Sequence, residues 1–169
     1  ANQLKSLSGS TVASLNTTQV AALSTAQVAG LSVASLAALS NTQVAAMTTT
    51  QVQSLTDLQI KSLSADQVTA LTSTQVSALQ TSQLKSLSTA QLQALDASDV
   101  AAMGTAQVQA LTDTQVKAMT TAAMAALTTT QVGALTTGQV KALSAAQVTA
   151  LTTASVAKLS TTQLSALSS

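Results

Sequence analysis

The chain has 169 residues, of which 46% are hydrophobic, 7% are charged and none is aromatic. It has no Cys, His or Pro, and its six Lys and five Asp leave a net charge of +1. These absences exclude a disulfide framework, an ordinary zinc site, a thiol nucleophile and an imidazole base. The charge is too small to attract nucleic acid or an anionic membrane. The high apolar content predicts a folded chain rather than a disordered one.

From residue 3 onward the sequence repeats every eight residues, and 21 octads follow one another without insertion or deletion. Position one is Gln in 16 octads, position two is aliphatic or Met, and position five is Leu or Met. Position six is nearly always a short polar residue. Because the first and last octads keep this pattern, we expect one continuous array over residues 1–169 without distinct capping repeats. The exceptions to Gln at position one are Thr11, Ser35, Asp99, Ala123 and Ser155.

The period of eight conflicts with one continuous α-helix. A helix turns about 100° per residue, so eight residues overshoot two turns by about 80° and the apolar positions drift around the axis. A β-strand would place positions two and five on opposite faces, as a thin β-solenoid buried on both sides requires. A β-solenoid and a distorted long helix therefore remain alternatives on the period alone.

The local pattern favours short helices. In residues 23–28, LSTAQV, a Ser is followed three residues later by Gln, which is the pattern of a capping box. The apolar residues on either side of the box form a hydrophobic staple. Each typical octad carries both signals, so each is predicted to form a helix of about seven residues that ends where the next is capped.

The charges agree with this prediction. The acidic residues occupy the cap or the first turn of the predicted helices, and the lysines occupy the second half, which is the order that complements a helix dipole. The acidic set is Asp57, Asp66, Asp96, Asp99 and Asp113, and the basic set is Lys5, Lys61, Lys85, Lys117, Lys141 and Lys158.

The sequence thus predicts an all-α fold, a superhelical solenoid of very short capped helices with one helix per octad. Isolated helices of this length are marginal in water, so neighbouring octads have to cover the apolar side chains. Local irregularity is expected at Val33, Leu58, Gln80 and Gly104, which depart from the repeat.

No catalytic, cofactor-binding or metal-binding residue is predicted. Asp96 and Asp99 lie three residues apart, but calcium needs about six to eight oxygen ligands, and cap and first-turn roles explain both. Asn16 begins a glycosylation sequon, yet it occupies a cap position where Asn is favoured. The Ser and Thr hydroxyls have no base beside them, so an enzyme is not expected.

The unit LTTxQVxAL resembles octad tracts of large secreted or cell-surface bacterial proteins, which are often labelled haem-utilisation or adhesin-like. The resemblance implies an extracellular, repetitive protein that is adhesive or matrix-forming. No His, Cys or Tyr is present as an axial haem ligand. The remaining candidates occupy core positions where Met replaces Leu or Val: Met47, Met103, Met119 and Met124.

We therefore expect a structural protein, a subunit or segment of an extracellular bacterial filament or surface fibre. Similar ends would let copies stack head to tail without closing, so the expected partner is the chain itself. The alternatives are a spacer stalk of a larger adhesin and a protein that binds ice or another flat surface. The last is suggested by threonines at position seven, such as Thr17, Thr49, Thr129 and Thr137.

The apolar stretches are too short to span a membrane. The chain begins at Ala1 and shows no charged-then-apolar leader. We therefore expect a processed mature chain or an internal segment of a longer repeat protein.

Overall fold

A computed structural model describes residues 8–167 of the chain. Over these residues it contains twenty short α-helices and no strand, so the all-α prediction is confirmed and the β-solenoid alternative is wrong. Lys5 lies outside the described residues. The helices are α1 (Gly9–Ala13), α2 (Thr17–Ala21), α3 (Thr25–Ala29), α4 (Val33–Ala37), α5 (Asn41–Ala45), α6 (Thr49–Ser54), α7 (Asp57–Ser62), α8 (Ala65–Thr69), α9 (Ser73–Ala78), α10 (Thr81–Ser86), α11 (Thr89–Gln93), α12 (Ala97–Ala102), α13 (Thr105–Ala110), α14 (Asp113–Ala118), α15 (Thr121–Ala126), α16 (Thr129–Gly133), α17 (Thr137–Lys141), α18 (Ala145–Ala150), α19 (Thr153–Val156) and α20 (Thr161–Ala166).

Each helix begins directly after position six, whose residue is the N-cap, as the capping boxes predict. At α9, for example, Thr72 has extended backbone angles (φ −77°, ψ 154°) and its hydroxyl accepts from the backbone N–H of Gln75 at 3.2 Å. The Gln75 Oε1 accepts in turn from the Thr72 N–H at 2.8 Å. The helices have four to six residues rather than the expected seven. They are shorter because the residue at position five has already left the helical conformation in many octads, as at Leu55 (φ −62°, ψ 135°).

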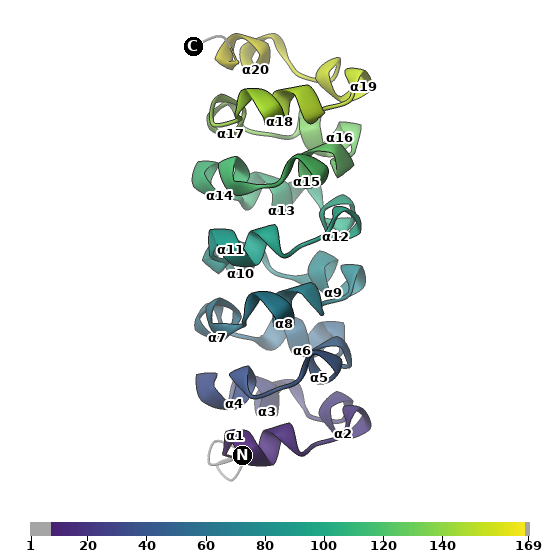
Figure 1. The fold of residues 1–169 in the computed structure, drawn as a ribbon, viewed down its shortest axis with the longest axis vertical. Helices are drawn as coiled ribbons and strands as arrows, with labels where there is room; N and C mark the ends of the chain where they lie inside the picture. Colours follow the sequence, from purple (N-terminus) through teal and green to yellow (C-terminus); the bar gives the residue numbers. More distant parts are fainter. Residues whose placement is uncertain (1–7, 168–169) are drawn as a thin grey trace.

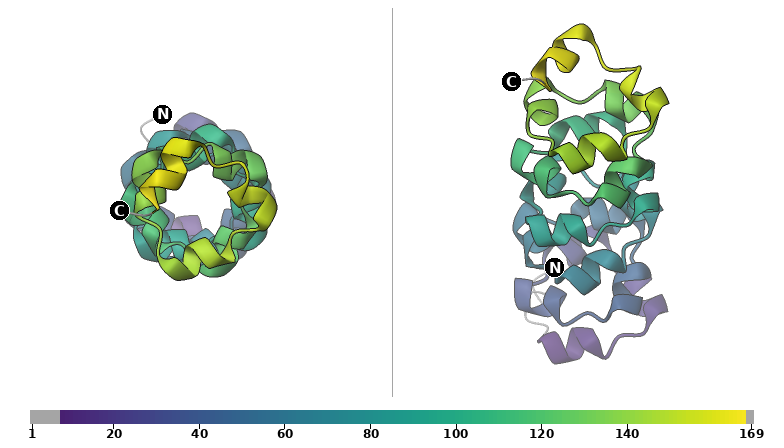
Figure 2. Two further views of the ribbon diagram at one scale, coloured as in Figure 1. Left: turned by 90° about the horizontal axis from the view of Figure 1, so that it is seen from above. Right: turned by 45° about the horizontal axis from the view of Figure 1, so that its top comes forward.

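The helices wind into a rod (Figure 1). Each helix from α1 to α17 contacts the helix three further along the chain. The view from above shows the chain circling one central axis (Figure 2). Helices α1 and α20 lie at opposite ends of the rod (Figure 1).

The apolar side chains of positions two and five form one continuous core along the rod, from Val12 to Leu159. Position two is fully buried at Val52, Leu84 and Val116, each 0% exposed. A buried side chain of this size contributes about 1.5–3 kcal/mol. Because each octad supplies only two such side chains, the core is narrow and depends on stacking between octads.

The irregular octads keep the regular backbone, so the expected local irregularity is wrong. Gln80 (φ −71°, ψ 155°) and Gly104 (φ −74°, ψ 158°) hold the same extended conformation as the other caps. Gln80 accepts no cap hydrogen bond and Gly104 has no side chain that could accept one, so only the glutamine half of each capping box remains. Val33 and Leu58 are exposed at 36% and 67%.

Most charges among the residues described lie where the helix dipole favours them, but Lys158 lies beyond the end of α19. Asp57, Asp66 and Asp113 stand in first turns, and Lys61, Lys85, Lys117 and Lys141 stand in last turns. Between residues 8 and 167 no helix has the length and apolar character needed to cross a membrane.

Candidate functional site

The most elaborate polar arrangement in the molecule surrounds the glutamine of position one. Gln51, at 1% exposed, uses its Oε1 to accept from the cap N–H of Thr48 at 2.7 Å. Its Nε2 donates to three backbone carbonyls at the end of α2: those of Val20 (2.9 Å), Ala21 (3.2 Å) and Leu23 (2.6 Å). One side chain therefore starts its own helix and closes the end of the helix four octads earlier.

The same arrangement recurs along the rod, and we call this contact the glutamine tie. The Nε2 atoms donate to carbonyls 28, 30 or 31 residues earlier. A helix packs against the helix three octads away along the chain, and a tie joins it to the helix four octads away. One superhelical turn therefore holds between three and four octads. The glutamines that make a tie are Gln43, Gln51, Gln59, Gln67, Gln75, Gln83, Gln91, Gln107, Gln115, Gln131, Gln139, Gln147 and Gln163.

The glutamine tie provides hydrogen-bond donors for carbonyls that very short helices leave unpaired. The last four carbonyls of a helix have no partner within it, so a helix of five residues leaves nearly all of its carbonyls unpaired. A net hydrogen bond contributes about 0.5–1.5 kcal/mol, and a buried group without a partner costs about 1–3 kcal/mol. The tie therefore stabilises the stacking of octads and fixes its register.

Sequence reasoning identified the Oε1 half of this arrangement and missed the Nε2 half. A capping box accepts Glu as readily as Gln, and Glu would suit the helix dipole better. Position one nevertheless holds 16 Gln and no Glu. That preference was the available signal, because only an amide supplies an acceptor and a donor together.

Asp99 takes the place of the glutamine in α12. It is buried, and its Oδ2 accepts from the Asp96 N–H at 3.1 Å while its Oδ1 accepts from the Ser73 hydroxyl at 2.9 Å. A carboxylate has no N–H to donate, so α12 makes no tie to α8. Burial raises the pKa of Asp99. The pKa of Asp96 is lowered, mainly by the hydrogen bond from the Ser98 hydroxyl and then by the backbone N–H of Asp99.

The other candidates have structural surroundings. Asp96 and Asp99 form a capping box with each other, and within residues 8–167 no group of three His, Cys, Asp or Glu could hold a metal ion. Asn16 caps α2. The four methionines are buried in the core: Met47, Met103, Met119 and Met124.

The threonines proposed for a flat surface do not share one degree of exposure. Thr17 and Thr137 are exposed, whereas Thr49 and Thr129 are half-buried.

The outer surface carries a second contact between octads, which we call the outer pair. Position seven of one helix faces position eight of the helix three octads on, 25 residues later. The Ser73 and Ser98 hydroxyl oxygens illustrate it at 3.4 Å. Four residues at position seven are apolar and have a position-eight residue 25 further along the chain, and in each case that residue is apolar as well. The pairs are Gly9 with Ala34, Val33 with Leu58, Ala65 with Ala90, and Ala97 with Ala122. The register of the repeat therefore places the two apolar exceptions in α4 and α7 opposite each other, where both side chains stay exposed.

Comparison with known proteins agrees with the octad pattern. The family model of the ALTTAQ repeat matches residues 1–33, 76–113 and 113–145, which together are more than half of the chain. No curated protein matches the sequence. The chain belongs to the ALTTAQ repeat family.

Proposed function

We propose that this member of the ALTTAQ repeat family is a structural protein, a subunit or segment of an extracellular bacterial filament or surface fibre. In the proposed fibre, solenoids stack head to tail. The observation that carries the proposal is the glutamine tie, because it gives thirteen of the octads the same directional contact with the octad four places before them. A directional contact of this kind propagates along an axis without closing.

The location of the most specific contacts supports a structural role. The buried polar groups are used in caps and ties, as in Gln51 and Gln139. Such contacts join octads rather than form a recess for a substrate. Extracellular placement and a bacterial source are parts of the proposal that rest on the resemblance of the octads to surface-protein tracts.

Electron microscopy of the purified protein tests the proposal. We expect unbranched rods with the width of one solenoid, whose length grows with protein concentration. Discrete particles with the dimensions of a single chain at every concentration would contradict self-assembly.

A spacer stalk is the second candidate. Helices α1 and α20 lie at opposite ends of a straight rod, which suits a segment that holds another domain away from a surface (Figure 1). A full-length gene product that carries a folded, non-repetitive domain beyond the octads, and that stays monomeric, would favour the stalk over the fibre.

A further inference from the structure

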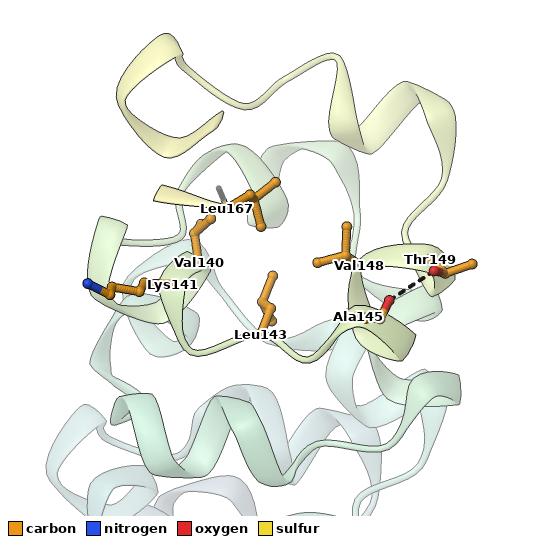
Figure 3. Close-up of a pocket in the computed structure, with 7 residues that line it drawn as sticks. All are labelled: Val140, Lys141, Leu143, Ala145, Val148, Thr149 and Leu167. Carbon is orange, nitrogen blue, oxygen red and sulfur yellow. Dashed lines mark hydrogen bonds between the residues drawn. The ribbon is translucent and has the colours of Figure 1, made fainter. Parts of the chain in front are cut away.

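The end of the rod that carries α17, α18 and α20 has an open pocket, whose lining is partly apolar and includes the polar Lys141 and Thr149. Val140, Leu143, Val148 and Leu167 line it, and their side chains surround a common space (Figure 3). Position two loses its cover toward this end: Val140 is 0% exposed, Val148 is half-buried and Leu164 is 43% exposed. In the middle of the rod the same positions are covered by the following octads.

Backbone acceptors accompany this pocket. The tie closest to this end comes from Gln163, whose Nε2 donates to the carbonyls of Gly133 (3.2 Å) and Leu135 (2.5 Å). Within residues 8–167 no glutamine amide reaches the corresponding carbonyls of α17 or of α19, which at α19 belong to Val156, Ala157 and Leu159. The pocket thus combines apolar walls with the carbonyl set that holds a glutamine amide elsewhere in the rod.

The opposite end presents the complementary groups. Gln19 and Gln27 complete their capping boxes, since their Oε1 atoms accept from Asn16 N–H (2.9 Å) and Ser24 N–H (2.6 Å). Their Nε2 atoms donate to no residue among 8–167, unlike those of the thirteen glutamines that make ties.

At this end the partly exposed apolar side chains are those of position five. Leu15 and Leu23, at position five, are half-buried, while Val12 and Val20, at position two, are buried. One end therefore offers amide donors and position-five side chains, and the other offers carbonyl acceptors and apolar side chains of both positions.

We propose that the end of the rod formed by α17–α20 is the docking site for the opposite end of a second copy of this chain, with the Gln19 and Gln27 amides bonded to the carbonyls at the ends of α19 and α20. These are the helices that lie four octads earlier when the repeat frame is continued across the join. This inference rests on the proposed function. The argument for a second copy is continuity with the stacking inside the chain, because the two ends carry the two halves of the tie. The join would continue the core and the glutamine ties from one chain into the next, with both chains pointing in the same direction along the rod.

Sedimentation velocity on the 169-residue protein and two pairs of variants tests the join. The first pair consists of two double variants. One carries Gln19→Glu and Gln27→Glu, and its control carries Gln53→Glu and Gln109→Glu. All four substitutions add the same charge, but Gln53 and Gln109 are exposed at position three. Glu keeps the Oε1 acceptor of the capping box and loses the donor, so the helices should stay folded, which circular dichroism checks.

The second pair compares Leu164→Lys with Leu58→Lys. Both leucines are exposed in the single chain, but only Leu164 is near the pocket end. We expect both end variants to weaken association by about tenfold or more, equivalent to about 1.4 kcal/mol, and both controls to assemble like the unmodified chain.

The outcomes separate the two proposals. If the unmodified chain assembles, and the end variants assemble as well as the controls do, this join is overturned and the proposed fibre still stands. A chain that stays monomeric at every concentration overturns the join and the proposed self-assembly together. Loss of assembly in the end variants alone supports the join.

Discussion

Helices α5–α11 and helices α12–α19 are built from the same octad but differ in how they are tied. In the first region every helix carries a glutamine tie, from Gln43 to Gln91. In the second region three helices lack one, because Asp99, Ala123 and Ser155 stand at position one. These three helices form, and the side chain of each N-cap residue accepts a backbone hydrogen bond, although α15 and α19 lack the reciprocal half of the capping box. The comparison indicates that caps and apolar side chains make each helix, whereas the glutamine amide fixes how helices stack.

The largest expected effect comes from removing a donor in the fully tied region. Gln83→Glu keeps the acceptor for the Gln80 N–H but places a buried carboxylate against the carbonyls of Val52 and Leu55. A buried charge left without a compensating partner typically costs about 3–5 kcal/mol, and we expect a loss of that size. Urea unfolding followed by circular dichroism measures it, with Gln109→Glu as the exposed control. Equal midpoints for the two variants would show that the Nε2 donor is unimportant.

The second prediction restores a tie where it is missing. Asp99→Gln should stabilise the chain at neutral pH by about 1–3 kcal/mol, because it removes a buried charge and adds a donor to the carbonyls at the end of α8. Ala123→Gln is the matched comparison, since it adds the same donor without removing a charge. Its gain should be smaller, about 0.5–1.5 kcal/mol. A loss of stability in both variants would contradict the account of the tie.

The pH dependence of Asp99 sharpens the same contrast. Burial raises its pKa in the folded chain, so the folded state binds the proton more tightly than the unfolded state does. Unfolding free energy should therefore rise as pH falls from neutral through the raised pKa, and the gain should end at the ordinary pKa of an unfolded aspartate. The lowered pKa of Asp96 has the opposite effect, a loss of stability as pH falls through its folded value.

Comparing the chain with Asp99→Asn isolates the Asp99 contribution, because Asp96 is present in both proteins. The difference in unfolding free energy between them should shrink on acidification from neutral pH. If the difference in unfolding free energy stays constant with pH, titration of Asp99 does not contribute to the pH dependence of stability.

The smallest expected effects come from the caps. Thr72→Ala removes the hydroxyl that accepts from Gln75 N–H and should cost about 1 kcal/mol. Gly104→Ser adds a cap hydroxyl to α13 and should gain only a few tenths of a kcal/mol, because Gly is already tolerated at a cap. Thermal melts of the two variants measure both shifts. A larger change at Gly104 than at Thr72 would contradict the capping assignment.

The helices could be predicted from the sequence because their determinants are local. The Ser24 and Gln27 pair specifies a helix start within four residues, and the structure confirms it. The number of octads per turn could not be predicted, because it depends on packing between residues about 28 apart. The role of the Gln51 amide was missed for the same reason: a capping box explains its Oε1, and its Nε2 finds partners only after the superhelix has closed one turn. Val33 and Leu58 were expected to disturb the repeat, but both lie in regular, capped helices.

The central claim, that each tied glutamine bridges two helices four octads apart, is tested most directly by hydrogen exchange of the side-chain amides, followed by nuclear magnetic resonance. The account predicts slow exchange for buried, tied glutamines such as Gln51, Gln83 and Gln139, and fast exchange for exposed ones such as Gln53 and Gln109. Equally fast exchange at Gln51 and Gln53 in the folded chain would contradict it.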